Sequence, residues 1–347
     1  MKSAIALTAT AAASAALLAF DAPADSIEFN VDGGTTLSKT FVTELEFALE
    51  DFVMTMNGEE IDPAMMGGEF DMDEAQGNVA LTLEVTDEYG GSSDGRPTSV
   101  TRTYDVMNAE YEMGDGESGD EGMDEIEGKS VEFTWNADDE AFDRKSAGDD
   151  DIEDDVLAGL AEDLDLRAML PRGAVSEGDS WSLGWDQMST VIMPGLDIDA
   201  AMESGGDWME DMPPGFAEEL EKVMGDEEME FLTCTYAGTR SVEGTDVAVI
   251  ELGAEIDESY DFSDFVAAMA EAEGGDMGGE MTLELGVSIQ LEGEMLWNVS
   301  AGHAHSMDWD AEIALEVFGE MVVEDFGMDM GMEAELSARV SRAVTVE

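Results

Sequence analysis

The stretch NVALTLEVTDEY, residues 78–89, decides the fold class, because an apolar side chain stands at every second position. The alternating apolar residues are Val79, Leu81, Leu83 and Val85. Successive side chains of a β-strand point to opposite faces, so a period of two gives one apolar face and one polar face. The stretch therefore predicts a strand that packs one face against a core.

The same period runs through the neighbouring segments. Apolar residues alternate in TFVTELEFALEDFVMTM (40–56), TSVTRTYDVMNAEYEM (98–113) and KSVEFTWNA (129–137). Turn-forming residues separate these runs, namely Asn57-Gly58, Gly90-Gly91, Asp94-Gly95 and an acidic, glycine-rich stretch at 114–128. Adjacent strands with such connections favour an antiparallel meander.

The second half of the chain repeats this rhythm. Residues 229–256 read as a hairpin with its turn near 242–244, and three long strand runs follow at 280–299, 304–323 and 330–346. A further strand-like run stands at 180–193. The chain is therefore expected to be mainly β in both halves.

Three segments change to a helical period. Residues 152–169 predict a helix that acidic residues precede and Pro171 ends, and its apolar positions are Ile152, Val156, Leu157, Leu160 and Leu164. Shorter helices are expected at 214–224 and 261–272. The predicted fold class is mainly β with a few helices (α+β), built as curved antiparallel sheets in two similar half-barrel-like halves.

The expected division of the chain follows from these patterns. Residues 1–24 read as a signal peptide, with Lys2 ahead of the apolar run 4–20 and small residues at Ala22-Pro23-Ala24. Residues 25–193 form the first β-rich half, 194–226 a linker with a short helix, and 227–347 the second half. A membrane-spanning helix is the alternative reading of residues 4–20. The expected location is periplasmic or extracellular, and no later run reaches 18 apolar residues.

The strongly acidic composition restricts the classes of molecule that the protein is expected to bind. Asp and Glu number 85 against 13 Lys and Arg, a formal net charge of −72. Nucleic acids and anionic membrane surfaces need a basic footprint, so both are excluded as partners. The carboxylates recur in nearly every segment, as expected of a halophilic or marine protein whose surface is adapted to salt. Weak binding of divalent cations at that surface is expected.

A resemblance rests on four landmarks: TLSKTF with FVMTMNGEE (36–41, 52–60), LPRGAVSEGDSW (170–181), YAGTRSVEGTDVAVIEL (236–252) and LEGEMLWNVSAGHAHSM (291–307). These segments resemble landmarks of uncharacterised exported, acidic, β-rich proteins of planctomycete-like bacteria. The layout of those proteins is similar to the half-barrel of periplasmic lipoprotein carriers. The resemblance carries no catalytic residues, and it implies a curved sheet that holds an apolar ligand.

Gly178-Asp179-Ser180 resembles a serine-hydrolase motif in three letters only. A nucleophilic serine needs a base to activate it, and Trp181 stands where trypsin-like enzymes have a glycine of the oxyanion hole. We therefore expect a turn at Gly178-Asp179 that leads into a strand, with Trp181 in the core. Cys234, the single cysteine, alternates with Leu232 and Tyr236 and is expected to be a buried structural thiol.

Two stretches could bind metals. His303 and His305 stand two residues apart, so on a strand both imidazoles would face one way, and Asp308 or Asp310 would add a ligand. A polar turn is the alternative reading. Carboxylates are dense at 114–128 and 148–155, but the spacing from Asp115 does not fit an EF-hand loop. The sequence lacks the phosphate-binding and dinucleotide-binding glycine motifs, so no cofactor is expected.

The predicted function is non-catalytic. We expect an exported binding or scaffold protein that holds an apolar small molecule or lipid in its curved sheet, with some of its 26 methionines lining the site. The alternatives are a hydrolase of unrecognised type and a divalent-cation-binding surface protein.

Overall fold

The computed structural model describes residues 25–62, 72, 75–114, 116–122, 126–148, 151–184, 187, 191, 194–195, 231–263, 266, 279–323 and 328–347. The predicted signal peptide 1–24, the helix 214–224, and most of the linker 194–226 and of the helix 261–272 lie outside these residues.

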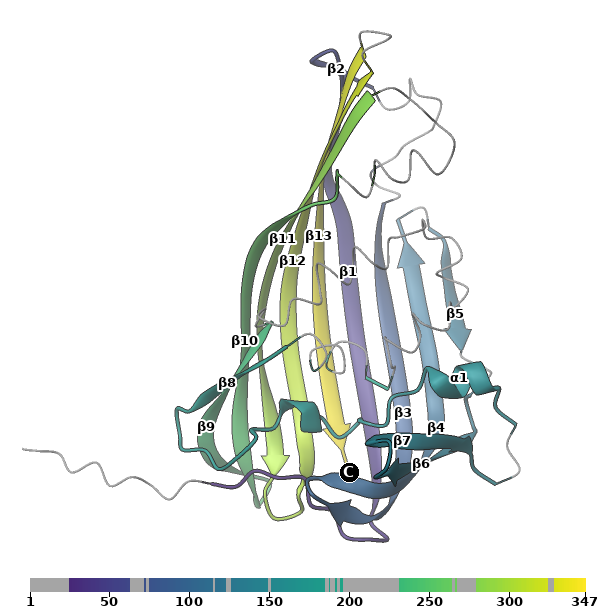
Figure 1. The fold of residues 1–347 in the computed structure, drawn as a ribbon, viewed down its shortest axis with the longest axis vertical. Helices are drawn as coiled ribbons and strands as arrows, with labels where there is room; N and C mark the ends of the chain where they lie inside the picture. The colour runs from purple at the N-terminus through teal and green to yellow at the C-terminus, as the bar shows by residue number, and fades with distance from the viewer. Residues whose placement is uncertain are drawn as a thin grey trace, which may run out of the picture.

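A single antiparallel sheet contains all thirteen described strands (Figure 1). The strands are β1 (Thr36–Met56), β2 (Glu59–Ile61), β3 (Gln76–Ser93), β4 (Arg96–Met113), β5 (Ser118–Gly122), β6 (Ser130–Asn136), β7 (Ala141–Ser146), β8 (Ser180–Leu183), β9 (Leu232–Val242), β10 (Thr245–Asp261), β11 (Gly279–Asn298), β12 (His303–Val323) and β13 (Met328–Val346). Their order is β7-β6-β4-β3-β1-β13-β12-β11-β10-β9-β8, with β2 beside β1 and β5 beside β4. The predicted mainly β, antiparallel fold is confirmed.

The two predicted half-barrel-like halves are not confirmed, because strands from both halves of the chain belong to one sheet. β1 pairs with β13 over most of its length, from Lys39 opposite Val346 to Met56 opposite Met330. This pairing places the first and last long strands side by side in the middle of the sheet. Among the described strands, β7 and β8 end the order and do not pair with each other, so the sheet is open.

The alternation read from the sequence divides the sheet into two faces, which we call the core face and the outer face. The core face carries most of the buried side chains, including Phe41, Val85, Met307 and Trp297, and the outer face carries most of the carboxylates. At the lower end of Figure 1, residues 25–31 and the segment 151–183 cross in front of the core face. Ile27, Phe29, Leu164 and Met169 from these segments are buried there.

The predicted helix 152–169 is reduced to α1 (Asp154–Ala158) and a short 3-10 turn, η3 (Arg167–Met169). The Arg102 side chain explains the break, because it donates hydrogen bonds to the carbonyls of Ala161 (3.0 Å) and Glu162 (2.9 Å). Leu166, just before η3, has a φ of 59°, which an α-helix does not accept. Leu160 and Leu164, two of the apolar positions of the predicted helix, are nevertheless buried.

Two further expectations needed correction. The stretch 114–128, expected to be a turn, contains β5, which pairs with Asn108–Glu112 of β4. The strand expected at 180–193 is only the four-residue β8 within the described residues. Gly178 ahead of it has a φ of +92°, which favours glycine, so the predicted turn before Ser180 is present.

Candidate functional site

Three charged side chains lie buried on the core face at the lower end of the sheet. Lys39, Asp87 and Arg102 come from the neighbouring strands β1, β3 and β4. Arg102 donates two hydrogen bonds to the Asp87 carboxylate, at 2.8 Å and 3.0 Å. Lys39 Nζ lies 2.7 Å from the same carboxylate. Two cations therefore share one anion in a place that water does not reach.

The loop that replaced the predicted helix completes this cluster. Asp165 Oδ1 lies 2.6 Å from Lys39 Nζ and accepts a hydrogen bond from the Tyr89 hydroxyl at 2.5 Å. Arg167 forms ion pairs with Glu162 and with Asp163, the latter at 3.1 Å. We call these residues the buried ion cluster: Lys39, Asp87, Tyr89, Arg102, Glu162, Asp163, Asp165 and Arg167. It fastens the segment 161–169 to the sheet.

Burial and charge act against each other in the cluster. Burial would raise the pKa of Asp87, but the charges of Arg102 and Lys39 hold that pKa well below its usual range. Burial raises the pKa of Glu162 to about 7, and the attraction of Arg167 only partly opposes it. Glu162 is only 6% exposed. Asp87 and Glu162 are therefore enclosed, whereas Asp163 and Arg167 at the edge of the cluster keep 18% and 13% of their side chains exposed.

Replacing Glu162 with Gln should raise stability relative to the wild type at alkaline pH. The folded-state pKa of about 7 lies above the unfolded value of 4.5, so the charged carboxylate costs stability increasingly as pH rises through this window. The difference between the proteins should grow from near zero at pH 4.5 to at most about 3 kcal/mol at pH 8. Urea unfolding at both pH values, in constant salt, measures it. A difference that does not change with pH would contradict the assignment.

A second region lies above the buried core, where β1, β3, β13, β12 and β11 continue upward. Its core-face side chains are apolar and, unlike those below, only partly buried, and Leu81 is 45% exposed. We call this region the upper core face: Leu45, Phe47, Leu49, Phe52, Val79, Leu81, Leu285, Val287, Ile289, Ile313, Leu315, Val317, Leu336 and Val340. The strand register places these side chains next to one another across the sheet. Ile313 on β12, for example, lies opposite Ile289 on β11.

The outer face of the same strands is polar and shallowly hollowed. A groove of about 950 Å³ crosses from the end of β4 to β11. Small residues in register form its floor, with Ala48 opposite Ser337 and Ala314 opposite both Ser337 and Ser288. Glu46, Glu312 and Arg339 also line it, and Arg339 pairs with Glu312 at 2.9 Å. The outer face of these strands is thus mainly polar, although Phe318 (41% exposed) and Val322 (38% exposed) also lie on it.

Ser180 stands at the start of β8, and its hydroxyl lies 2.9 Å from the Thr235 hydroxyl. The histidines lie on β12, and three strands separate β12 from β8. At about 4.8 Å per strand, that places β12 roughly 19 Å from Ser180. The geometry supports the turn-and-strand reading over a nucleophile. Trp181 is part-buried and donates a hydrogen bond to the Met169 carbonyl at 3.1 Å.

His303 and His305 lie at the start of β12, and the pairing of this strand with β11 is irregular at His305. Trp297 lies opposite Ala304 and Leu296 opposite Ser306, so His305 is the extra residue of a bulge. The bulge interrupts the alternation on which the shared metal site depended. His303 Nδ1 lies 2.6 Å from the Ala304 carbonyl oxygen. Within the described residues, no group of three or more His, Cys, Asp or Glu side chains is arranged to hold a metal ion, and the metal hypothesis stays a prediction.

Cys234 is fully buried on β9, and burial raises the pKa of its thiol to about 12. The thiolate needed for nucleophilic attack is therefore scarce at neutral pH. This position agrees with the expected structural role.

The sequence did contain a signal for the buried ion cluster. Lys39 stands between Leu37 and Phe41 in the apolar phase of its strand, and Arg102 occupies the same phase in β4. A charged residue in the apolar phase of a strand must be paired when it is buried. The chain has only 13 basic residues and 85 acidic ones, so a basic residue in the apolar phase of a strand indicates a buried ion pair.

No protein family matches this chain, and a search of curated proteins found no match either. In the part of the chain that the structure describes, no helix is long and apolar enough to cross a membrane.

Proposed function

We propose that this chain is an exported, non-catalytic binding protein that holds an apolar ligand of the lipid class against its upper core face. One observation carries the proposal. The core face stays apolar well above the buried core, while its side chains there remain partly exposed. Covering such a surface with an apolar molecule is favourable, because each Å² of apolar surface removed from water stabilises the complex by about 25 cal/mol.

The rest of the architecture supports this function. The buried ion cluster and the core fix the lower end of the sheet, so the upper strands extend from a rigid base. The sheet is open among the described strands, and the resemblance to lipoprotein carriers implies an apolar ligand held on a curved sheet. Carboxylates occupy the outer face of these strands, so an apolar ligand would bind the core face in preference to the outer face.

Binding of the neutral fluorescent probe N-phenyl-1-naphthylamine, in molar salt, tests the proposal. The wild type should enhance its fluorescence saturably. Leu315→Gln on the core face should weaken binding about tenfold, because one buried leucine side chain contributes about 1.5 kcal/mol. Leu81→Gln should act in the same direction.

The matched control is Glu316→Gln, which places the same side chain at the next position of β12 but on the outer face. Its affinity for the probe should equal that of the wild type. Absence of saturable binding, or an equal loss in the control, would refute a ligand site on the core face. The urea unfolding midpoint of Leu315→Gln should be close to that of the wild type, which shows that its weaker binding does not come from unfolding.

A further inference from the structure

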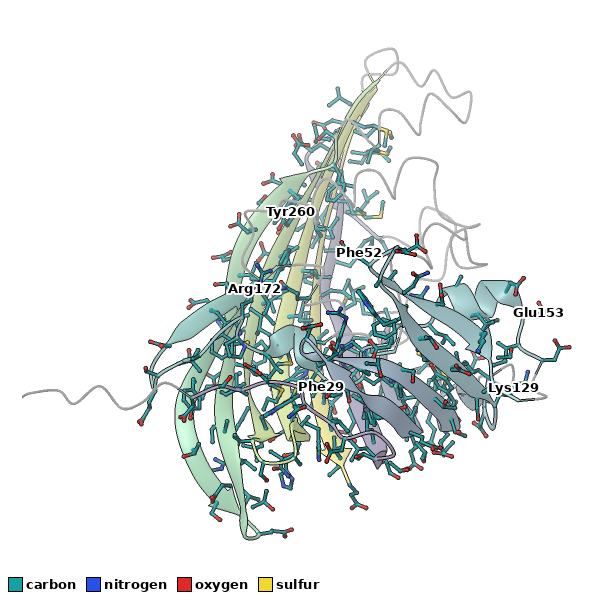
Figure 2. The ribbon with its side chains drawn as sticks, turned by 60° about the horizontal axis from the view of Figure 1, so that its bottom comes forward. Phe29, Phe52, Lys129, Glu153, Arg172 and Tyr260 are labelled. Atoms are coloured by element: carbon teal, nitrogen blue, oxygen red, sulfur yellow. The ribbon has the colours of Figure 1, made fainter. Side chains whose placement is uncertain are left out.

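Methionines form a row across the upper end of the sheet. On four neighbouring strands, Met56 lies opposite Met330, Met330 opposite Met321, and Met321 opposite Met281. Each of the four side chains is partly exposed. We call these four residues the methionine row. Sulfur atoms are visible near the narrow upper end of the sheet in Figure 2.

All four side chains belong to the core face. Each stands an even number of residues beyond a core-face residue of its own strand, as Met330 does relative to Ala334. The next row down adds Met54 opposite Met332. The Met332 methyl group lies 3.6 Å from the place where a Cβ on Gly319 would stand, so Met332 leans over β12. Six thioethers therefore gather on four strands.

Directly opposite residues of antiparallel strands have Cβ atoms about 4.5–5.5 Å apart. The methionine side chain is unbranched and has three rotatable bonds, so neighbouring sulfurs can converge on one point. Thioether sulfur is a soft ligand that selects monovalent copper over calcium, magnesium or zinc. The outer face adds a long-range attraction for cations, since Glu320 and Glu333 stand on the same strands.

We propose that the methionine row binds one soft monovalent cation, of the Cu(I) or Ag(I) class, through Met330, Met321 and the flanking Met56. The site is distinct from the apolar surface below it and does not depend on the proposed lipid function. Thioethers carry no proton to release, so binding should be independent of pH between 4.5 and 7, unlike binding by carboxylates or histidine.

Silver(I) is the probe of choice, because it needs no reductant. Titration of the full chain in molar sodium nitrate, which screens the carboxylates without precipitating silver, should give one tight site. The double variant Met330→Leu/Met321→Leu, which conserves side-chain volume, should lose about a hundredfold in affinity. The control Met107→Leu/Met113→Leu removes two methionines of β4 that are not in the row and should bind as the wild type does.

A second measurement keeps the proposal testable if the double variant does not fold. In the wild type with labelled methionine methyl groups, one equivalent of silver should shift the NMR signals of Met56, Met321 and Met330 and leave that of Met107 in place. The proposal is overturned by absence of tight binding in nitrate, by equal loss in both double variants, by displacement of silver with zinc or calcium, or by methyl shifts outside the row.

Discussion

Replacing Asp87 with Ala should cost about 3–5 kcal/mol of unfolding free energy, because it leaves Lys39 and Arg102 as buried charges with too little compensation. Both cations are at most 1% exposed, so water cannot take the place of the carboxylate. Asp87→Asn keeps the shape of the side chain and should still destabilise strongly. Urea unfolding in constant molar salt at pH 7 measures the loss.

A surface ion pair provides the control for this prediction. Lys145 pairs with Glu132 at 3.1 Å, and the lysine side chain is 64% exposed. Glu132→Gln should therefore cost less than about 1 kcal/mol. If Asp87→Ala were as mild as this control, the buried ion cluster would not hold the loop to the sheet.

The same carboxylate gives the stability a defined pH dependence. The folded-state pKa of Asp87 lies below its unfolded value. Its contribution is therefore present above the unfolded pKa and is lost as pH falls through the folded pKa. Glu162 acts in the opposite direction, since its folded-state pKa is raised. Asp87 therefore weakens the cluster as pH falls below 3.8, whereas Glu162 weakens it as pH rises from 4.5 through about 7.

The second large effect should come from removal of salt. Carboxylates stand directly opposite one another on the outer face, with Asp51 opposite Glu335 and Glu335 opposite Glu316. Like charges in this position destabilise a sheet. The screening length shortens from about 10 Å at 0.1 M to about 3 Å at 1 M salt, which spans the separation of such pairs. The thermal unfolding midpoint should rise steeply over this range.

Two single variants connect this effect to the register. Glu335→Gln removes the middle charge of the row and should stabilise the protein by about 0.2–1 kcal/mol in 0.1 M salt, with a smaller gain in 1 M. Glu312→Gln removes the partner of Arg339 and should not stabilise at either salt concentration. An unfolding midpoint that is equal at low and molar salt would contradict adaptation of this surface to salt.

Local pattern predicted the strands well, because the period of two is imposed by the backbone. The hairpin turn near Glu243 and the three long strands of the second half follow the expected ranges closely. Long-range pairing left no trace in the pattern, so the adjacency of β1 and β13 could not be read from it. The prediction of a helix over 152–169 was wrong because Arg102, which is distant in sequence, donates hydrogen bonds to backbone carbonyls that would accept hydrogen bonds within a helix.

The candidate sites show the same limit. The apolar upper core face follows from alternation alone, since Phe47 and Leu315 were already in the apolar phase of their strands. The methionine row needed the register, because its four members come from four strands. The shared site of His303 and His305 depended on regular alternation, which the bulge at His305 interrupts.

The pairing of β1 with β13 also governs the order in which the molecule can assemble. Lys39 finds its partner Val346 only after nearly the whole described chain has been made. Closing so long a loop has a high entropic cost before its contacts form, which slows folding. Until β13 arrives, β1 has one long edge without a partner, and an open edge invites pairing with other chains. Synthesis from the N-terminus therefore makes the middle of the sheet the last part to be completed.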